Sequence, residues 1–208
     1  MKLNDATPFC KVCFKEIEYT PSIFLLSNPC LCKKCFEEFN CKWMRWKEGK
    51  VKCLALYDYN EKIRNTLYRF KGCGDIELKD VFFAYPINVL KLIYHGYVVV
   101  PAPSSASHNE ERGYNQVIEM CKILKLPTLD ILQKTKESKQ SDLSFYERQK
   151  VNKIIALKEK VDLSTKKILF VDDVFTTGST TRACLNLLEK LHPKKLSCLI
   201  MAKTKFKF

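Results

Sequence analysis

The stretch Ile168-Leu-Phe-Val-Asp-Asp-Val-Phe-Thr-Thr-Gly-Ser-Thr180 gives the strongest indication of the fold of this chain. It begins as an apolar run, places Asp172 and Asp173 at the end of that run, and continues into a turn rich in hydroxyl groups. An apolar run followed by such a turn is typical of a buried strand that leads into a helix. Parallel α/β sheets bind their ligands where strands end in this way. The stretch therefore predicts a ligand site at the carboxyl end of a strand.

The turn after the two acids has the chemistry of a sugar-phosphate site. Backbone N–H groups at the start of a helix can converge on one phosphate, and the helix dipole favours negative charge there. Asp172 and Asp173 are placed to accept hydrogen bonds from ribose hydroxyls. The alternative is that the acids only end a strand and the hydroxyls only cap a helix. The residues assigned to phosphate binding are Thr176, Thr177, Gly178, Ser179 and Thr180.

The rest of the chain beyond residue 50 alternates strand and helix patterns. Such alternation predicts an α/β fold in which a parallel sheet is flanked by helices. A Walker loop is excluded, because no Gly-x4-Gly-Lys-Ser/Thr occurs in the chain. The patterns predict strands over 52–59, 97–100, 167–171 and 196–202, and helices over 61–71, 115–124 and 179–191, with a further helical stretch interrupted near Pro86.

Six of the eleven cysteines fall within residues 1–41, which marks residues 1–50 as a separate module. Cys10, Cys13, Cys32 and Cys35 form two C-x2-C pairs with 18 residues between them. This spacing is typical of a structural zinc site with four thiolates. Cys30 or Cys41 can replace one of the four ligands, and the sequence does not decide between them. The predicted domains are thus a zinc-binding module, residues 1–50, and a main domain, residues 51–208.

Composition narrows the class of protein. The 208 residues carry 36 Lys and Arg against 23 Asp and Glu, a formal net charge of +13, and 46% of them are hydrophobic. These values exclude a disordered or collagen-like chain. No apolar run approaches the roughly 20 residues that cross a bilayer, so we expect no membrane insertion and a cytoplasmic protein with reduced thiols. The positive charge favours anionic partners: phosphorylated ligands, nucleic acid or an acidic protein surface.

The stretch around Asp172 and Asp173 resembles the phosphoribosyl pyrophosphate signature of the type I phosphoribosyltransferases. Further segments narrow the resemblance to the ComF family, competence proteins related to amidophosphoribosyltransferase that carry an N-terminal zinc module. These segments are Ala55-Leu-Tyr-Asp-Tyr59 with Ile63-Arg64 and Phe70-Lys71-Gly72, Val100-Pro-Ala-Pro103 with Arg112-Gly-Tyr-Asn-Gln116, and Lys134-Thr135 with Gln140-Ser141, Leu143 and Glu147-Arg148.

The resemblance implies a type I phosphoribosyltransferase fold and an enzyme that binds phosphoribosyl pyrophosphate with Mg²⁺. It implies Asp172 and Asp173 as catalytic residues. The turn after the Val-Pro-x-Pro strand would receive the pyrophosphate, and residues 134–148 would form a loop that closes over the ligand. This chain departs from the family in its Ser104-Ser-Ala-Ser-His-Asn109 stretch, which leaves fewer cations near the leaving group. The additional substrate-binding residues are Ser104, Ser105, Arg112 and Lys71.

Family resemblance also implies a role in natural transformation, where single-stranded DNA enters the cytoplasm beside a DNA-uptake helicase and a recombination mediator. Trp43, Arg45, Trp46 and Lys47 interleave aromatic and cationic groups that can contact bases and phosphates. The same residues can equally pack the zinc module onto the main domain. Two alternatives to an enzyme therefore stay open: a non-catalytic accessory that binds single-stranded DNA, and a protein-docking module.

Overall fold

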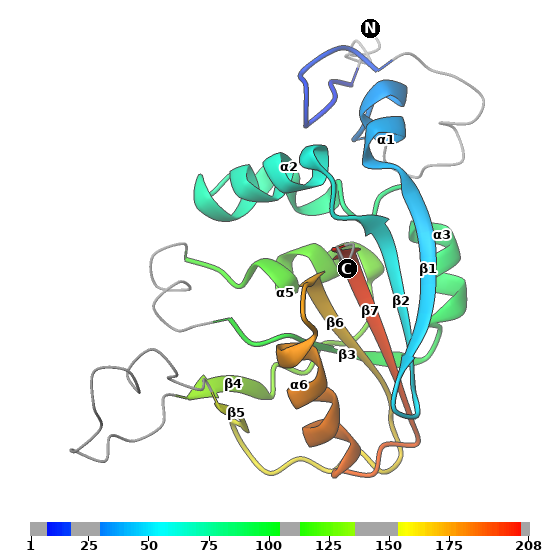
Figure 1. The fold of residues 1–208 in the computed structure, drawn as a ribbon, viewed down its shortest axis with the longest axis vertical. Helices are drawn as coiled ribbons and strands as arrows, with labels where there is room; N and C mark the ends of the chain where they lie inside the picture. Colours follow the sequence, from blue (N-terminus) through cyan, green and yellow to red (C-terminus); the bar gives the residue numbers. More distant parts are fainter. Residues whose placement is uncertain (1–7, 18–29, 105–112, 136–153, 205–208) are drawn as a thin grey trace, which may run out of the picture.

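The computed structural model describes residues 8–17, 30–104, 113–135 and 154–204 (Figure 1). A five-stranded sheet forms the centre, with strand order β1-β2-β7-β6-β3. Strands β2, β7, β6 and β3 run parallel, and β1 pairs antiparallel with β2. The bounds of these strands are β1 Cys41–Glu48, β2 Val51–Asp58, β3 Tyr97–Pro101, β6 Lys167–Phe175 and β7 Lys195–Lys203.

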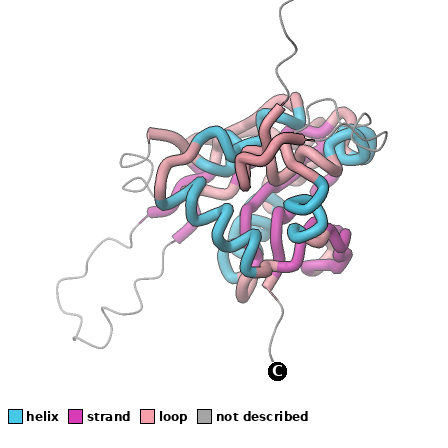
Figure 2. Tube along the Cα trace, turned by 90° about the horizontal axis from the view of Figure 1, so that it is seen from above, coloured by secondary structure: helices cyan, strands magenta, loops and turns pink. Residues whose placement is uncertain are grey.

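Helices lie on both sides of this sheet, with α3 on one side and α6 on the other (Figure 1). A second sheet, the hairpin of β4 (Leu132–Thr135) and β5 (Ile154–Leu157), projects from the body of the molecule. Figure 2 shows the same hairpin from above, at the edge of the molecule. The helices are α1 Lys33–Phe39, α2 Glu61–Gly72, α3 Ile87–Ile93, α5 Gln116–Cys121 and α6 Ser179–Glu189, with 3₁₀ turns η1 Ile76–Asp80 and η2 Lys122–Leu124.

The predicted α/β fold is confirmed. Each strand and helix predicted beyond residue 50 is present, with its ends shifted by a few residues. Strand β6 is buried along nearly its whole length because it is central in the sheet and helices cover both faces, and this explains its continuous apolar run. The sheet is mixed rather than wholly parallel, because the unpredicted strand β1 folds back on β2.

Two asparagines cap the helices that begin near the carboxyl end of the sheet. Asn60 precedes α2, and its side-chain oxygen accepts from the backbone N–H of Ile63 at 2.9 Å. Asn115 precedes α5 and accepts in the same way from Val117 at 2.9 Å. Such N-caps satisfy backbone donors that a helix leaves free at its first turn. They fix the starts of the two helices that flank the carboxyl end of the sheet.

The boundary predicted at residue 50 falls in the turn between β1 and β2, and both strands belong to one sheet. Upstream of β1, helix α1 packs on the main body through aromatic rings. Phe39 is fully buried, with its ring centroid 5.7 Å from that of Tyr57. The division into two domains stays a prediction. Among the described residues, no helix has both the length and the apolar character needed to cross a membrane.

Candidate functional site

A polar cavity of about 330 Å³ lies at the carboxyl end of β6. Its walls come from segments far apart in the sequence: the end of α2, the residues after β3, the start of α5, strand β4, and the turn that leads from β6 into α6. This is the place at which parallel α/β sheets bind ligands. The lining residues are Lys71, Ala102, Pro103, Ser104, Gln116, Val117, Lys134, Asp172, Asp173, Val174, Thr176, Thr177, Gly178, Ser179, Thr180 and Thr181.

Gly178 shapes the turn before α6. Its φ of +78° lies in the left-handed region that side chains other than glycine rarely adopt. A Cβ at this position would lie 2.3 Å from the ring of Phe175 and 2.7 Å from the guanidinium of Arg182. Within the described part of the chain, no backbone N–H from Thr176 to Thr180 has a hydrogen-bond partner. The turn therefore presents free donors at the start of an 11-residue helix.

Arg182 holds this turn from outside the cavity. Its Nη2 donates to the backbone oxygen of Thr177, and its Nη1 lies 3.4 Å from a carboxylate oxygen of Glu48 on strand β1. The hydroxyls of Thr177 and Ser179 lie 3.0 Å apart and share a hydrogen bond. These contacts hold the turn in one conformation before any ligand binds.

Asp172 and Asp173 both line the cavity although their side chains are largely buried, with 8% and 7% of the residues exposed. The N–H of Asp173 donates to a carboxylate oxygen of Asp172 at 2.9 Å. Lys71, at the end of α2, forms an ion pair with Asp173. The acids therefore do not end the strand, because β6 continues to Phe175, and they meet a cation at the wall of the cavity.

The environment of Asp172 favours its protonated form. Burial is the main cause that raises the pKa of Asp172 to about 7, and the negative charge of Asp173 raises it further. The hydrogen bond from the Asp173 N–H and the charges of Lys71 and Lys134 act in the opposite direction. A ligand that donates hydrogen bonds to this carboxyl group would favour its ionised form.

The structure brings most of the predicted substrate-binding residues together. Asp172, Asp173, Ser104 and Lys71 line one cavity with the turn from Thr176 to Thr180. Ser105 and Arg112 lie outside the described residues, as do residues 136–148 of the predicted closing loop.

Sequence reasoning did not assign Gln116 or Arg182 to the site and placed Lys134 only in the closing loop. Lys134 and Gln116 line the cavity, and Arg182 supports its turn. Both lining residues stand inside segments that carry the family resemblance, so a signal for them was present in the sequence. Arg182 had none, because its partner Glu48 lies on a strand that the sequence did not predict.

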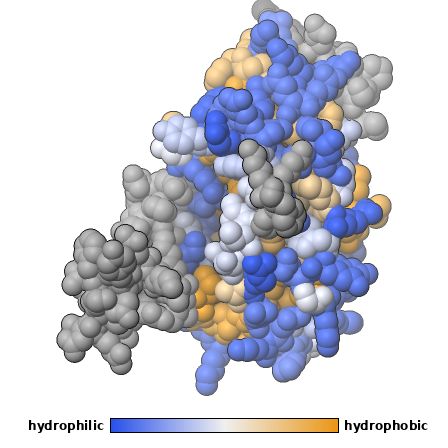
Figure 3. Space-filling view, viewed as in Figure 1, coloured by the Kyte–Doolittle hydropathy of each residue, from blue (hydrophilic) through white to orange (hydrophobic). Residues whose placement is uncertain are grey.

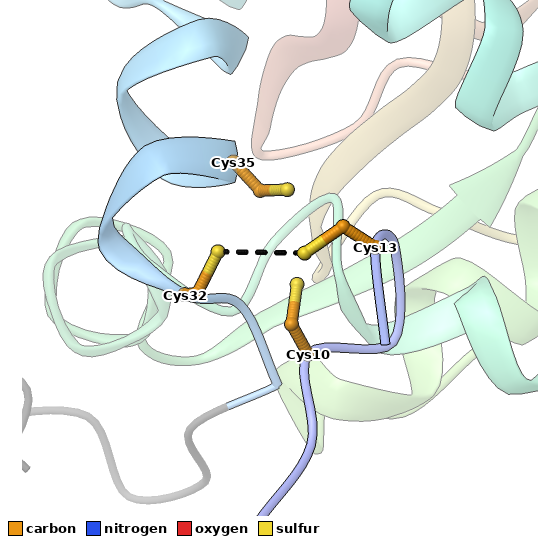
Figure 4. A group of neighbouring side chains, drawn as sticks. All are labelled: Cys10, Cys13, Cys32 and Cys35. Carbon is orange, nitrogen blue, oxygen red and sulfur yellow. Dashed lines mark hydrogen bonds between the residues drawn. The ribbon is translucent and has the colours of Figure 1, made fainter. Parts of the chain in front are cut away.

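The four predicted metal ligands form a second site. The sulfurs of Cys10, Cys13, Cys32 and Cys35 all lie within 4.8 Å of one another, and those of Cys13 and Cys32 are 3.7 Å apart. Figure 4 shows the four thiols pointing toward a common centre from two segments, the N-terminal loop and the start of α1. We call this group the cysteine cluster.

The cysteine cluster fits a zinc ion. Four sulfurs about 2.3 Å from one ion at tetrahedral angles lie about 3.8 Å apart, close to the distance between Cys13 and Cys32. Burial raises the pKa of the Cys13 thiol, but hydrogen bonds from the backbone of Lys15 and from neighbouring thiols lower it to about 7. A thiolate is the form that binds metal. Cys30 and Cys41 are not part of the described cluster, so it consists of the two predicted pairs.

Comparison with known proteins gives the family. No model of a protein family matches the chain. The chain is 30% identical over 208 residues to the competence protein ComFC of Streptococcus pneumoniae (strain ATCC BAA-255 / R6), and the alignment covers 89% of this chain and 94% of that protein. The chain belongs to the ComFC family of competence proteins. A second ComFC, from Bacillus subtilis (strain 168), is 33% identical over 139 residues, which cover 65% of this chain and 58% of the relative.

Similar solved structures are phosphoribosyltransferases. A purine phosphoribosyltransferase from Pyrococcus horikoshii Ot3 has a TM-score of 0.40 at 15% identity, over 64% of this chain and 83% of that one. A hypoxanthine phosphoribosyltransferase from Staphylococcus aureus has a TM-score of 0.36 at 11% identity, over 66% of this chain and 61% of that one. Glutamine phosphoribosylpyrophosphate amidotransferase from B. subtilis has a TM-score of 0.37 at 18% identity, over 61% and 27%.

Proposed function

We propose that the cavity binds phosphoribosyl pyrophosphate with Mg²⁺ and that the protein transfers the phosphoribosyl group to an acceptor during DNA uptake. One observation carries this proposal: a pair of buried acids and a turn of unpaired backbone N–H groups line the same cavity. The first can hold the hydroxyls of a sugar, and the second can hold its phosphate. The cavity is of a size suited to a small ligand.

The 5′-phosphate would sit at the turn from Thr176 to Thr180. The free N–H groups there can donate hydrogen bonds to an anion. The first turn of α6 adds the positive end of its helix dipole. Gly178 has no side chain to keep the phosphate away from the backbone. The ribose would then lie over Asp172 and Asp173, whose carboxylates accept from vicinal hydroxyls.

The pyrophosphate would face the residues after β3, where Ser104 lines the cavity. Lys71 and Lys134 are the cations that line the cavity in the described part of the chain, and both can offset negative charge there. The Asp172 and Asp173 carboxylates are the oxygen ligands that would hold Mg²⁺, directly or through water. When bound with the ligand, Mg²⁺ neutralises the charge of the leaving pyrophosphate.

Transfer would break the bond between the anomeric carbon and pyrophosphate, and the ribose would gain positive charge as the bond breaks. Asp172 and Asp173, which the family resemblance implies as catalytic residues, would lie close enough to stabilise that charge. Their position before the reaction is set by the N–H of Asp173 and by Lys71. A site arranged in advance loses little free energy to rearrangement when the charge develops.

Isothermal titration calorimetry tests the binding step. We expect phosphoribosyl pyrophosphate with Mg²⁺ to bind the unchanged protein in a 1:1 ratio and to bind Asp172→Ala/Asp173→Ala at least about 100-fold more weakly, because several charge-assisted hydrogen bonds are lost. Asp162→Ala is the matched control, since Asp162 is an exposed acid outside the cavity. Equal affinity of the double variant and the unchanged protein would refute the assignment of the two acids.

A second candidate function is favoured by a surface at the other end of the sheet. Lys47 on β1 faces Lys52 on β2, and Lys167 on β6 faces Lys195 on β7. The four side chains are exposed and project from one face of the sheet; we call them the basal lysine face. Like charges directly opposite one another are unfavourable, and none of the four forms an ion pair with another described residue.

We propose that the basal lysine face contacts the phosphates of single-stranded DNA. In Figure 3, the lower edge of the molecule, where these strands begin, carries mostly hydrophilic side chains. Trp46 does not serve as a stacking platform, because its ring packs edge-on against Phe175 at 5.1 Å and Lys203 covers it at 4.2 Å. The lysines would therefore contact the phosphate backbone of the DNA, and the affinity would depend strongly on the salt concentration. From family resemblance alone, we also propose a DNA-uptake helicase and a recombination mediator as cytoplasmic partners.

A further inference from the structure

Helix α2 connects the cysteine cluster to the cavity. Near its end, Arg69 donates from Nη1 to the backbone oxygen of Val12 at 2.8 Å. Val12 lies between the two cysteines of the first C-x2-C pair. Two residues after Arg69, Lys71 forms the ion pair with Asp173 at the cavity wall. Figure 1 shows α2 between the N-terminal segment and the sheet. One turn of helix thus touches both sites.

Geometry places the two cations on opposite sides of this helix. Successive residues of an α-helix are about 100° apart, so Arg69 and Lys71 are separated by about 200°. Phe70, between them, is fully buried, and its ring centroid is 5.7 Å from that of Phe82. The hydroxyl of Tyr114 donates to the Phe70 backbone oxygen at 2.7 Å. A shift of this turn on the side of the cysteine cluster would therefore move Lys71 on the side of the cavity.

Arg69 is fixed by more than one contact. Its Nη2 lies 2.8 Å from a carboxylate oxygen of Asp75, which follows α2, and its guanidinium carbon lies 5.3 Å from the ring centroid of Phe14. Phe14 comes directly after the first C-x2-C pair. Arg69 therefore contacts both a backbone oxygen and a ring of the segment whose conformation metal ligation would fix.

We propose that Arg69 is a positioning residue through which the cysteine cluster, when it holds zinc, places Lys71 against Asp173, so that zinc and the sugar-phosphate ligand bind cooperatively. The inference rests on the proposed function, because Lys71 and Asp173 matter here as part of the ligand site. Without metal, the backbone oxygen of Val12 loses its fixed place, and Arg69 loses its anchor. The end of α2 can then move, and Lys71 no longer holds the acid pair in place for the ligand.

Calorimetry on the full, zinc-loaded chain tests this, with phosphoribosyl pyrophosphate and Mg²⁺ as the probe. We expect Arg69→Ala to weaken binding at least about fivefold, the lower end of common coupling between sites. Arg64→Ala is the matched control: Arg64 is an exposed arginine of the same helix, and we expect no change. In a Lys71→Met background, Arg69→Ala should have no further effect, because Arg69 acts through Lys71.

The results of these titrations distinguish a failure of the proposed function from a failure of this inference alone. If the unchanged protein does not bind the probe, the proposed function fails and this inference fails with it. If Arg69→Ala retains zinc and binds as tightly as the unchanged protein, this inference alone is wrong. An Arg69→Ala effect of the same size in both backgrounds would also overturn it, since that result indicates a structural role that does not pass through Lys71.

A second measurement needs no variant of Arg69, which covers the case in which Arg69→Ala fails to fold. Coupling between two sites is reciprocal, so the ligand must strengthen zinc binding by the factor by which zinc strengthens ligand binding. We expect saturating phosphoribosyl pyrophosphate and Mg²⁺ to raise the zinc affinity of the unchanged protein at least about fivefold, measured by competition with a colorimetric chelator. The same mixture should have no such effect in Asp172→Ala/Asp173→Ala. Equal zinc affinity with and without ligand in the unchanged protein would refute the coupling.

Discussion

The two ends of the central sheet carry positive charge in opposite ways. At the carboxyl end, Lys71 and Lys134 line a cavity together with two buried carboxylates, and Lys71 is paired with one of them. At the amino end, the basal lysine face is exposed and has no acidic partner among the described residues. A buried, compensated site can select a ligand by shape and hydrogen bonds, whereas an exposed one attracts any polyanion and is screened by salt.

The largest difference between the two ends should come from glycine. Gly178 at the carboxyl end and Gly49 at the amino end both have positive φ, +78° and +58°. A Cβ on Gly178 would lie 2.3 Å from the Phe175 ring, whereas a Cβ on Gly49 would meet nothing within 4 Å. We expect Gly178→Ala to weaken calorimetric binding of phosphoribosyl pyrophosphate at least about 100-fold, because the turn must shift. Gly49→Ala should leave it unchanged, and equal losses in both would contradict the account.

Charge removal at the amino end should have the next largest effect. We expect Lys52→Ala/Lys195→Ala to weaken binding of a fluorescein-labelled single-stranded oligonucleotide about tenfold at low salt, measured by anisotropy. The slope of log affinity against log salt should fall by about 0.7 for each lost phosphate contact. Binding of phosphoribosyl pyrophosphate should not change. A DNA affinity equal to that of the unchanged protein would refute the basal lysine face as a nucleic-acid surface.

The two ends of the sheet should also differ in how binding depends on pH. The pKa of Asp172 is raised to about 7, mainly by burial, and the ribose hydroxyls favour its ionised form. Ligand binding must then release a proton below pH 7, and affinity should fall by up to about tenfold per pH unit there. Calorimetry in buffers of different ionisation enthalpy measures that proton. No proton release at pH 6 would contradict this role, and DNA binding at the amino end involves no carboxylate and should not follow the same profile.

The same raised pKa of Asp172 has a consequence for stability without ligand. The folded protein holds this proton more tightly than the unfolded chain does, so its contribution to the free energy of unfolding is complete below about pH 4. That contribution is lost as the pH rises through about 7. Asp172→Asn should therefore unfold at a higher denaturant concentration than the unchanged protein at pH 8, and an equal or lower midpoint would contradict the raised pKa.

The smallest effect should come from Arg182, which supports the phosphate turn from outside. We expect Arg182→Ala to weaken ligand binding about fivefold, the factor for one lost hydrogen bond of about 1 kcal/mol. Arg182→Lys keeps a charge near Glu48, but its single nitrogen cannot contact Glu48 and the Thr177 backbone oxygen as the two guanidinium nitrogens do, so it should restore only part of the affinity. A full loss of binding in Arg182→Ala would contradict a role limited to one supporting hydrogen bond.

The residues that line the cavity differ in how far local sequence patterns indicate them. The apolar run before Asp172 and Asp173 indicates a strand because both faces of β6 are covered, and the cysteine spacing alone indicated the metal cluster. Strand β1 was not predicted because the alternation of its inward and outward residues is broken. The register shifts between Cys41 and Met44, and Trp43 has a positive φ of 52°. Contacts that depend on that strand were therefore beyond prediction.

Lys134 and Arg69 are two further residues whose positions no local pattern in the sequence indicates. Lys134 was expected in a closing loop, but it lies on β4, whose partner β5 begins at Ile154. Pairing across so long a separation leaves no local pattern in the sequence. The link from Arg69 to Val12 spans 57 positions and joins a helix to a loop, so only the folded chain brings the two residues together.

A crystal structure of the protein with phosphoribosyl pyrophosphate and Mg²⁺ would show where the sugar phosphate binds. We predict density for the 5′-phosphate within hydrogen-bond distance of the backbone N–H groups from Thr176 to Thr180, with the ribose hydroxyls on Asp172 and Asp173. A phosphate bound instead at the basal lysine face, with those N–H groups in contact with water alone, would contradict it.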